Sequence, residues 1–310
     1  MRVTGDGYVR YRILTIAAIG AVCIGSVLIS GAEEKDIAPN GKGLYTLDHP
    51  QNGNGNAGGK PNRPGNNGIS YHGGPVILGT VNVYYIWYGN WGGNSATTIL
   101  TDLASSIGPS PYFNINTTYY NGSSVHVSNS VHYAGSTTDN YSQGSSLTDA
   151  QIQTVVSSAI SSGKLPKDTN GVYFVLTSAD ATASSGFCTQ YCGWHTHGTI
   201  SGSDIKYAFI GNPDRCPSAC EAQATSPNGN AGADGMASII AHELEEATTD
   251  PDLNAWYDTR GQENADKCAW TFGTTYTVNG ASANMKLGTR DYLIQRNWVN
   301  ALGGYCATGY

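Results

Sequence analysis

The chain has 310 residues, enough for one large domain or two small ones, and a formal net charge of −7. Only 13% of its residues are charged, whereas glycine occurs 40 times and tyrosine 20 times, against 5 phenylalanines. Such a composition is typical of an extracellular, β-rich protein whose surface is solvated by hydroxyl and amide groups. Nucleic-acid binding is excluded, because phosphate recognition needs a clustered basic surface and no basic run follows residue 40.

The N-terminus predicts export. Arg10 and Arg12 precede an apolar stretch over residues 13–29, and Ser30 and Ala32 supply the small residues of a cleavage site. The stretch is slightly long for a signal peptide and barely long enough to cross a bilayer, so a cleaved signal peptide and a retained signal anchor both stay open. Either one places the rest of the chain outside the cytosol, with membrane contact only if the leader is uncleaved.

We therefore expect three segments: a leader over residues 1–32, a linker over 33–70 and one globular domain over 71–310. The linker is rich in Asn, Gly and Pro. It holds too few apolar side chains to offset the entropy lost on ordering, so we expect it to be disordered.

In the globular domain, apolar periodicity predicts strands and helices in alternation. The expected strands cover 75–88 (one long strand or a pair), 125–133, 172–176, 207–210 and 292–294. The expected helices cover 96–107, 147–162 and 235–249, with Ser95 and Ser146 as caps of the first two and Asp250-Pro251 ending the third. This order predicts an α+β fold, an α/β-like sandwich in which helices pack on a mixed sheet.

Six cysteines remain once the leader and its Cys23 are removed. An even number in an exported chain predicts disulfides, and the pairing is left open because six cysteines allow many pairings. A zinc ribbon is the alternative for the two C-x3-C pairs, although the usual ribbon spacing is C-x2-C. The six are Cys188, Cys192, Cys216, Cys220, Cys268 and Cys306.

The clearest chemical pattern is a helical segment that carries His242, Glu243 and Glu246. Residues four apart lie one turn above each other on a helix, so the imidazole of His242 and the carboxylate of Glu246 can bind one cation. Glu243 lies close to where a metal-bound water would be and is the candidate catalytic base. The pattern is that of the zincin helix H-E-x-x-H with Glu in place of the second His.

A third metal ligand must come from farther along the chain. Glu263 is the first candidate, because it follows Glu246 at nearly the interval of zincins whose third ligand is a glutamate. Asp252 is the second candidate. Asp266 is expected to orient His242 by a hydrogen bond from outside the ligand set.

The stretch from Trp194 to His197 contains two histidines two residues apart. If it forms a strand, both side chains share a face and His195 becomes an alternative ligand. The simpler interpretation, which we favour here, is that both histidines lie exposed in a loop beside a disulfide.

A structural charge cluster without metal competes with the metal site, because H-E-x-x-E is short and arises by chance. Burial of an unpaired charge costs on the order of several kcal/mol, so the charges of such an apolar helix must be paired, metal-bound or exposed. Glu245 is the one expected to face solvent. For a His-Glu-Glu ligand set zinc is the first choice, with manganese or calcium as alternatives.

Across residues 71–306 the sequence resembles the EXORDIUM / phosphate-induced protein 1 family, which is known from plants and also occurs in microbes. The matching segments are Tyr71–Pro75, Val83–Trp91, Val172–Asp180, Gly186–Cys188, Cys192–His195, Ile210–Asn212, Cys216–Pro217 with Cys220, Asp234–Met236, Ala241–Leu244, Asn254–Tyr257 and Glu263–Cys268. The turn Thr248–Pro251 and the short loop around Gly273 depart from the plant pattern and look more like microbial members. The resemblance implies an extracellular or cell-wall protein linked to growth and to nutrient or carbon status.

Three functions follow as hypotheses. The first is a secreted zinc-dependent hydrolase, peptidase-like, with His242, Glu246 and Glu263 as ligands, acting on an extracellular peptide, protein or cell-wall polymer. The second is a non-catalytic extracellular protein in growth or nutrient-status signalling, whose metal or charge cluster is structural. Carbohydrate binding through surface tyrosines and tryptophans is the third.

Overall fold

The structure is a computed structural model that describes residues 68–310. The predicted leader and nearly all of the predicted linker lie outside this range. Among the helices of residues 68–310, none is both long and apolar enough to cross a bilayer.

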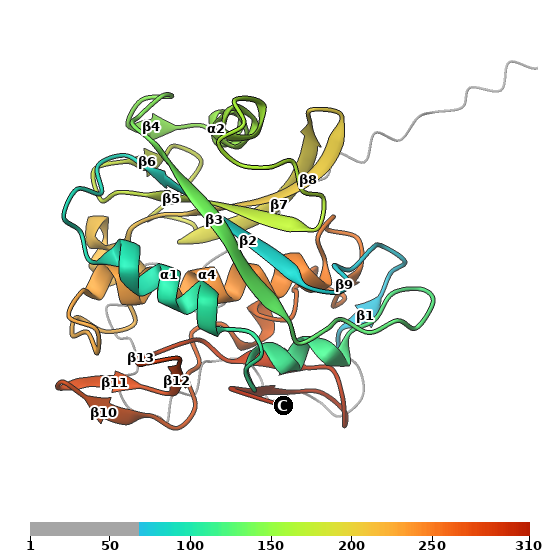
Figure 1. Ribbon diagram of the computed structural model, residues 1–310. Helices are drawn as coiled ribbons and strands as arrows, with labels where there is room; N and C mark the ends of the chain where they lie inside the picture. The colour runs from blue at the N-terminus through green and yellow to red at the C-terminus, as the bar shows by residue number, and fades with distance from the viewer. Residues whose placement is uncertain (1–67) are drawn as a thin grey trace, which may run out of the picture. The chain divides into compact units, whose positions relative to one another are not determined.

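A five-stranded mixed sheet lies at the centre of this region (Figure 1). Its strands follow the order β3 (Val131–Asp139), β2 (Val81–Tyr88), β5 (Gly171–Thr177), β8 (Ser203–Ile210) and β7 (Gly193–Ile200). The first four are parallel to one another, and β7 runs antiparallel to β8 at one edge. β2 and β5 are buried along almost their whole length, as expected for parallel strands that are covered on both faces.

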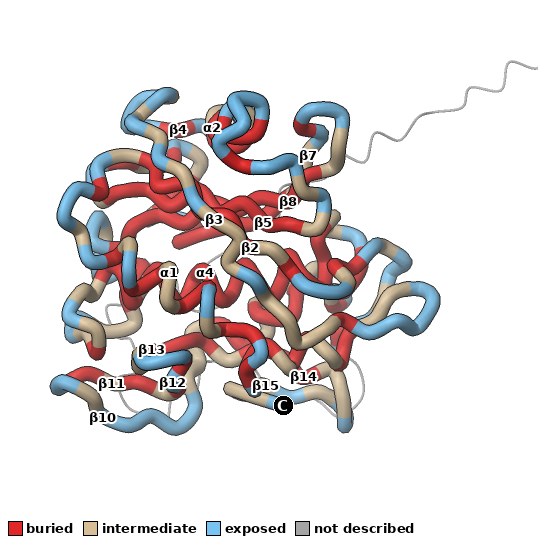
Figure 2. The backbone as a smooth tube through the Cα atoms, in the orientation of Figure 1, coloured by how far each residue is buried: buried red, intermediate tan, exposed pale blue. Residues whose placement is uncertain are grey.

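Helices cover both faces of the sheet (Figure 1). α2 (Asp149–Ser161) lies on one face, while α1 (Ala96–Ser106) and α4 (Ala231–Thr249) lie on the other. The predicted α+β architecture of a mixed sheet with packed helices is therefore confirmed. α4 is buried on nearly all sides, since short elements lie beyond it on the side away from the sheet (Figure 2). Its polar side chains consequently lie inside the protein.

The remaining elements are short and form two-stranded sheets, 3-10 turns and one helical turn. The strand pairs are β1 (Ser70–Tyr71) with β9 (Trp256–Tyr257), β4 (Ser146–Leu147) with β6 (Thr182–Ala183), β10 (Tyr276–Val278) with β11 (Ala281–Ala283), β12 (Met285–Leu287) with β13 (Arg290–Tyr292), and β14 (Asn297–Val299) with β15 (Tyr305–Ala307). The turns are η1 (Phe113–Thr118), η2 (Pro213–Arg215), η3 (Asp266–Cys268) and the short α3 (Pro217–Cys220).

All six cysteines of this region form disulfides, which confirms the prediction and leaves no zinc ribbon. The two C-x3-C pairs cross-link each other as Cys188–Cys216 and Cys192–Cys220. The third disulfide joins Cys268 to Cys306. Cross-links of this kind disfavour the unfolded chain, each typically by about 2–4 kcal/mol.

Several element boundaries differ from those expected. Residues 75–80 precede β2 rather than belong to it, and Gly79 lies there at φ +74°, a conformation that ends an extended run. β3 begins at Val131, so the first six residues of the strand expected over 125–133 lie outside it. α2 is capped by Thr148 in a capping box with Gln151, not by Ser146. α4 begins four residues earlier than expected, at Ala231, and β7 was not expected as a strand.

The C-terminus of α4 is closed by Asp250, as the sequence indicates. Its backbone N–H donates to the carbonyl of Glu246 at 2.7 Å, and its Oδ1 accepts from the backbone N–H groups of Asn254 and Ala255 at 2.6 Å each. The carboxyl is fully buried. Burial raises the pKa of Asp250 from 3.8 to about 6, although the backbone donors oppose the shift.

Asp250→Asn is expected to remove a pH-dependent loss of stability. The folded protein holds the Asp250 proton up to about pH 6, whereas the unfolded chain releases it near pH 4, so wild-type stability falls as the pH rises through this window. Relative to the variant, the loss amounts to about 2 kcal/mol between pH 4 and 7. Urea unfolding at both pH values measures it.

Asp180→Asn is the control for this experiment. Asp180 is exposed, and its pKa is lowered by hydrogen bonds from Ser178 and Tyr141. The stability that it contributes is therefore lost only below about pH 4, and Asp180→Asn is expected to run nearly parallel to the wild type from pH 4 to 7. An unfolding free energy of Asp250→Asn that runs parallel to that of the wild type from pH 4 to 7 would contradict the assignment.

Candidate metal centre

α4 brings His242 and Glu246 together one helical turn apart, as the sequence predicts. Nε2 of His242 lies 3.1 Å from Oε1 of Glu246, and the side chains are 1% and 2% exposed. Glu243, the candidate base, is fully buried on the same helix. The helix thus carries three ionisable side chains into the interior.

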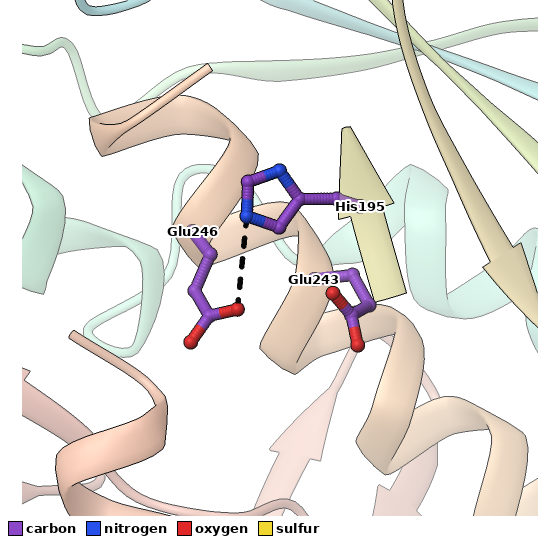
Figure 3. A group of neighbouring side chains, drawn as sticks. All are labelled: His195, Glu243 and Glu246. Carbon is purple, nitrogen blue, oxygen red and sulfur yellow. Dashed lines mark ion pairs between the residues drawn. The ribbon is translucent and has the colours of Figure 1, made fainter. Parts of the chain in front are cut away.

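β7 adds an imidazole from a distant part of the chain (Figure 3). Nε2 of His195 lies 3.8 Å from Oε2 of Glu246, and His195 is only 1% exposed. The interpretation of His195 as an exposed loop residue is therefore wrong. β7 can press against α4 because Gly193 has no side chain: a Cβ there would lie 2.5 Å from Cγ2 of Ile239.

The loop before η3 supplies the carboxylate of Glu263, and the first residue of η3 supplies that of Asp266. Oε2 of Glu263 lies 3.0 Å from Nε2 of His195, and Glu263 is 1% exposed. Oδ1 of Asp266 lies 3.6 Å from Nε2 of His242, and the backbone N–H of Asp266 donates to Oε1 of Glu246 at 3.0 Å. Asp266 therefore lies near His242, and the hydrogen bond expected to orient His242 stays a prediction, whereas Glu263 contacts the imidazole of His195.

These side chains form one continuous group, which we call the buried cluster: His195, His242, Glu243, Glu246 and Glu263, with Asp266 at its edge. Two overlapping sets within it place their ligand atoms within 4.8 Å of one another, namely His195 with Glu243 and Glu246, and His242 with Glu246 and Asp266. Glu246 belongs to both sets and offers one oxygen to each imidazole. Within each set the ligand atoms lie close enough together to meet one cation.

Burial dominates the electrostatics of the cluster. It lowers the pKa of His195 to about 3, so the imidazole is neutral at physiological pH, the form that binds metals. It also raises the pKa of Glu246 to about 7, although His242 nearby opposes the shift. Nδ1 of His195 is buried without a hydrogen-bond partner in residues 68–310.

Glu245 lies inside the protein, and its expected exposure to solvent is wrong. It is fully buried, and its Oε2 accepts a hydrogen bond from Nδ2 of Asn297 on β14. Burial raises the pKa of Glu245 well above its ordinary value, and the Asn297 hydrogen bond only partly opposes this. The two adjacent glutamates of α4 therefore have different neighbours. Glu245 contacts the side-chain amide of Asn297, whereas Glu246 contacts the two imidazoles.

Asp252, the second candidate for the third ligand, lies in a separate and more exposed group. Its Oδ1 is 3.7 Å from Nδ1 of His197 and 3.3 Å from Nζ of Lys206. Asp204 contacts the same histidine and the same lysine. Because Lys206 already places a positive charge between these carboxylates, this group needs no cation.

His195 is the residue of the site that the sequence analysis undervalued. The pattern Trp194-His195-Thr196-His197 does alternate, but the side chains on the face of His195 are polar, and His197 is half-exposed. Trp194 points to the other face, where its ring stacks on that of Phe209. The signal that could have identified this strand is Trp194, a large aromatic residue that alternates with the two histidines.

Comparison with known proteins gives a consistent picture. The family model for the phosphate-induced protein 1 conserved region matches residues 69–287. EXORDIUM-like 3 of Arabidopsis thaliana is 33% identical over 77% of this chain and 82% of its own length, and EXORDIUM-like 5 is 33% identical over 74% and 75%. PHOSPHATE-INDUCED 1 of Nicotiana tabacum is 28% identical over 63% and 68%. No solved structure matches the chain.

Asn297→Ala is expected to lower the free energy of unfolding by about 2 kcal/mol, because Oε2 of the buried Glu245 then loses its donor. Urea unfolding at pH 7 measures the loss. The nearby Asn300→Ala serves as the control, since the backbone N–H of Asn300, not its side chain, makes the hydrogen bond to Thr118. Equal stability of the two variants would show that the amide does not stabilise Glu245.

Proposed function

The chain belongs to the EXORDIUM / phosphate-induced protein 1 family, and we propose that it is an exported, non-catalytic member whose fold is held by one buried divalent cation. The observation that carries the proposal is the convergence of the buried cluster. Its five side chains come from β7, α4 and the loop before η3, and each is at most 2% exposed. Within the cluster, two sets that share Glu246 bring carboxylates and imidazole nitrogens, both metal-binding groups, within 4.8 Å of one another.

The proposed ligands are Nε2 of His195, Nε2 of His242 and the carboxylates of Glu246 and Glu263. This set is supported by the contact distances: 3.1 Å for His242–Glu246, 3.8 Å for His195–Glu246 and 3.0 Å for His195–Glu263. Two nitrogens and two carboxylate oxygens suit tetrahedral zinc, with manganese or calcium as alternatives. Two carboxylates would also balance the charge of a divalent ion, which matters where water is excluded.

Burial favours a structural role for the cation. A catalytic zinc site keeps a position open to water and substrate, whereas a structural site is closed by protein ligands. Here the imidazoles are each 1% exposed and Glu243 is fully buried. The cation would therefore connect β7, α4 and the η3 loop rather than meet an extracellular substrate.

A zinc-dependent hydrolase of the peptidase type is the second candidate function. It is favoured by Glu243, whose carboxylate lies within 4.8 Å of ligand atoms of His195 and Glu246, as a base acting on bound water would need. The burial of the same side chain opposes it. Extracellular peptides, proteins or wall polymers would be its substrates.

The proposed location is outside the cytosol. The six bridged cysteines support it, because disulfides persist in oxidising compartments. The tobacco relative carries the name PHOSPHATE-INDUCED 1, which suits a role in growth or nutrient-status signalling. Partners would then be extracellular proteins or cell-wall polymers.

Elemental analysis of protein produced in an oxidising compartment is expected to give about one zinc per chain. Glu246→Gln and His242→Ala are expected to lose the metal, because each removes a ligand. Glu245→Gln is the matched control: it changes an equally buried neighbour on the same helix and should keep the metal. Chelation of the wild type should lower its thermal midpoint by about 10 °C.

Two results of the elemental analysis would contradict the metal site. One is a wild-type protein without stoichiometric metal, and the other is a Glu246→Gln variant that keeps as much metal as Glu245→Gln. Near-ultraviolet circular dichroism of each variant separates loss of metal from loss of the fold.

Glu243→Gln distinguishes the structural role from the catalytic one. We expect the zinc-loaded wild type and the variant to be equally inactive on casein and on mixed peptides, and to have equal metal content and thermal midpoints, because Glu243 is not a proposed ligand. Mass spectrometry of the peptides detects cleavage. Zinc-dependent cleavage by the wild type that is lost in Glu243→Gln would overturn the non-catalytic proposal and support the hydrolase.

A further inference from the structure

An open polar cavity of about 510 Å³ lies away from the buried cluster and shares no residue with it. It is formed where the loop before α4 meets the hairpins β10–β11 and β12–β13, which Figure 1 shows at the lower left, on the side of α4 away from the sheet. Small-molecule sites in proteins usually span about 300–1,000 Å³. A cavity of this size accommodates a ligand of one or two sugar rings.

The lining of the cavity combines hydrogen-bond donors with acceptors. It includes the side-chain amides of Asn228 and Asn279, the hydroxyl of Thr289, the guanidinium of Arg290 and the carboxylate of Asp291. A ligand with several hydroxyl groups, each both donor and acceptor, matches such a set.

Several of these groups are held in place by the protein. Nδ2 of Asn228 donates to the carbonyl of Asp291 at 2.8 Å, and Nδ2 of Asn279 donates to the carbonyl of Pro227 at 2.8 Å. Both amides therefore use their nitrogen to join the α4 loop to the hairpins. In a bound state their oxygens would accept from ligand hydroxyls. A site fixed in this way loses little entropy on binding.

An exposed aromatic ring stands beside the polar groups. The side chain of Tyr276 on β10 is 43% exposed, and its hydroxyl donates to Oδ1 of Asp291 at 2.7 Å. This hydrogen bond joins Tyr276, which is not itself a lining residue, to the lining residue Asp291. The faces of exposed aromatic rings pack on the C–H groups of sugars. A planar aromatic face beside amides and a carboxylate suits a sugar ring better than it suits a peptide.

The charge of the cavity indicates which sugars it can bind. Nε of Arg290 lies 2.6 Å from Oδ2 of Asp102, so its positive charge is already paired, whereas Asp291 adds a negative charge to the cavity. The whole chain carries −7. Uronic acids and phosphorylated ligands are therefore repelled, and we propose that this cavity binds a neutral glycan.

Isothermal titration calorimetry of the full protein tests this with cellohexaose and mannohexaose as neutral probes and hexagalacturonate as the anionic one; insoluble cellulose tests polymer binding. At least one neutral probe, soluble or insoluble, is expected to bind, and more tightly than hexagalacturonate. Tyr276→Ala is expected to weaken this binding at least tenfold, and Thr289→Val several-fold, with unchanged thermal midpoints.

Tyr305→Ala is the matched control, because Tyr305 is a similarly exposed tyrosine, at 41%, on the separate hairpin β14–β15. It should bind like the wild type. Absence of binding to every neutral probe, stronger binding of hexagalacturonate, or an equal loss in Tyr276→Ala and Tyr305→Ala would each overturn the proposal. Because the cavity and the buried cluster share no residue, none of these results depends on the metal.

Discussion

The fold is organised around ionisable groups that α4 carries into the protein interior. A helix buried on nearly all sides would ordinarily be apolar throughout, yet this one carries His242, Glu243, Glu245 and Glu246 at 0–2% exposure. Each charge left without compensation in such a place would cost more than most single contacts contribute. The protein meets this constraint in two ways on adjacent residues. Glu245 takes a hydrogen bond from the amide of Asn297, whereas Glu246 lies between two imidazoles.

Disulfides and the buried cluster lie close together along the chain. Cys192 comes one residue before β7, which carries His195, and its partner Cys220 ends α3, the last helical turn before α4. Cys268 belongs to η3, directly after Glu263 and Asp266, and its partner Cys306 lies in β15. The two cross-links thus restrain segments that supply donors to the cluster. Because the cross-links restrain these segments, less entropy is lost on folding when side chains from distant parts of the chain come together in the cluster. This favours a rigid site.

The sequence predicted what depends on local spacing. The approach of His242 to Glu246 follows from helical periodicity alone, and the buried strands β2 and β5 follow from their runs of apolar residues. The predictions from sequence were wrong where the position of a residue depends on packing against distant parts of the chain. β7 is an edge strand, and the side chains that share a face with the buried His195 are polar, so its alternation did not suggest burial. The surroundings of Glu245 are built by β14, some 50 residues later in the chain, and no local pattern indicates that contact.

The central claim is that a single cation joins β7, α4 and the η3 loop inside the protein. A crystal of the untreated protein, measured on both sides of the zinc absorption edge, tests it most directly. We predict one strong anomalous peak between the imidazoles of His195 and His242, within bonding distance of the Glu246 carboxylate. A map without a peak there, or with its only peak at His197, Asp204 and Asp252, would contradict the account.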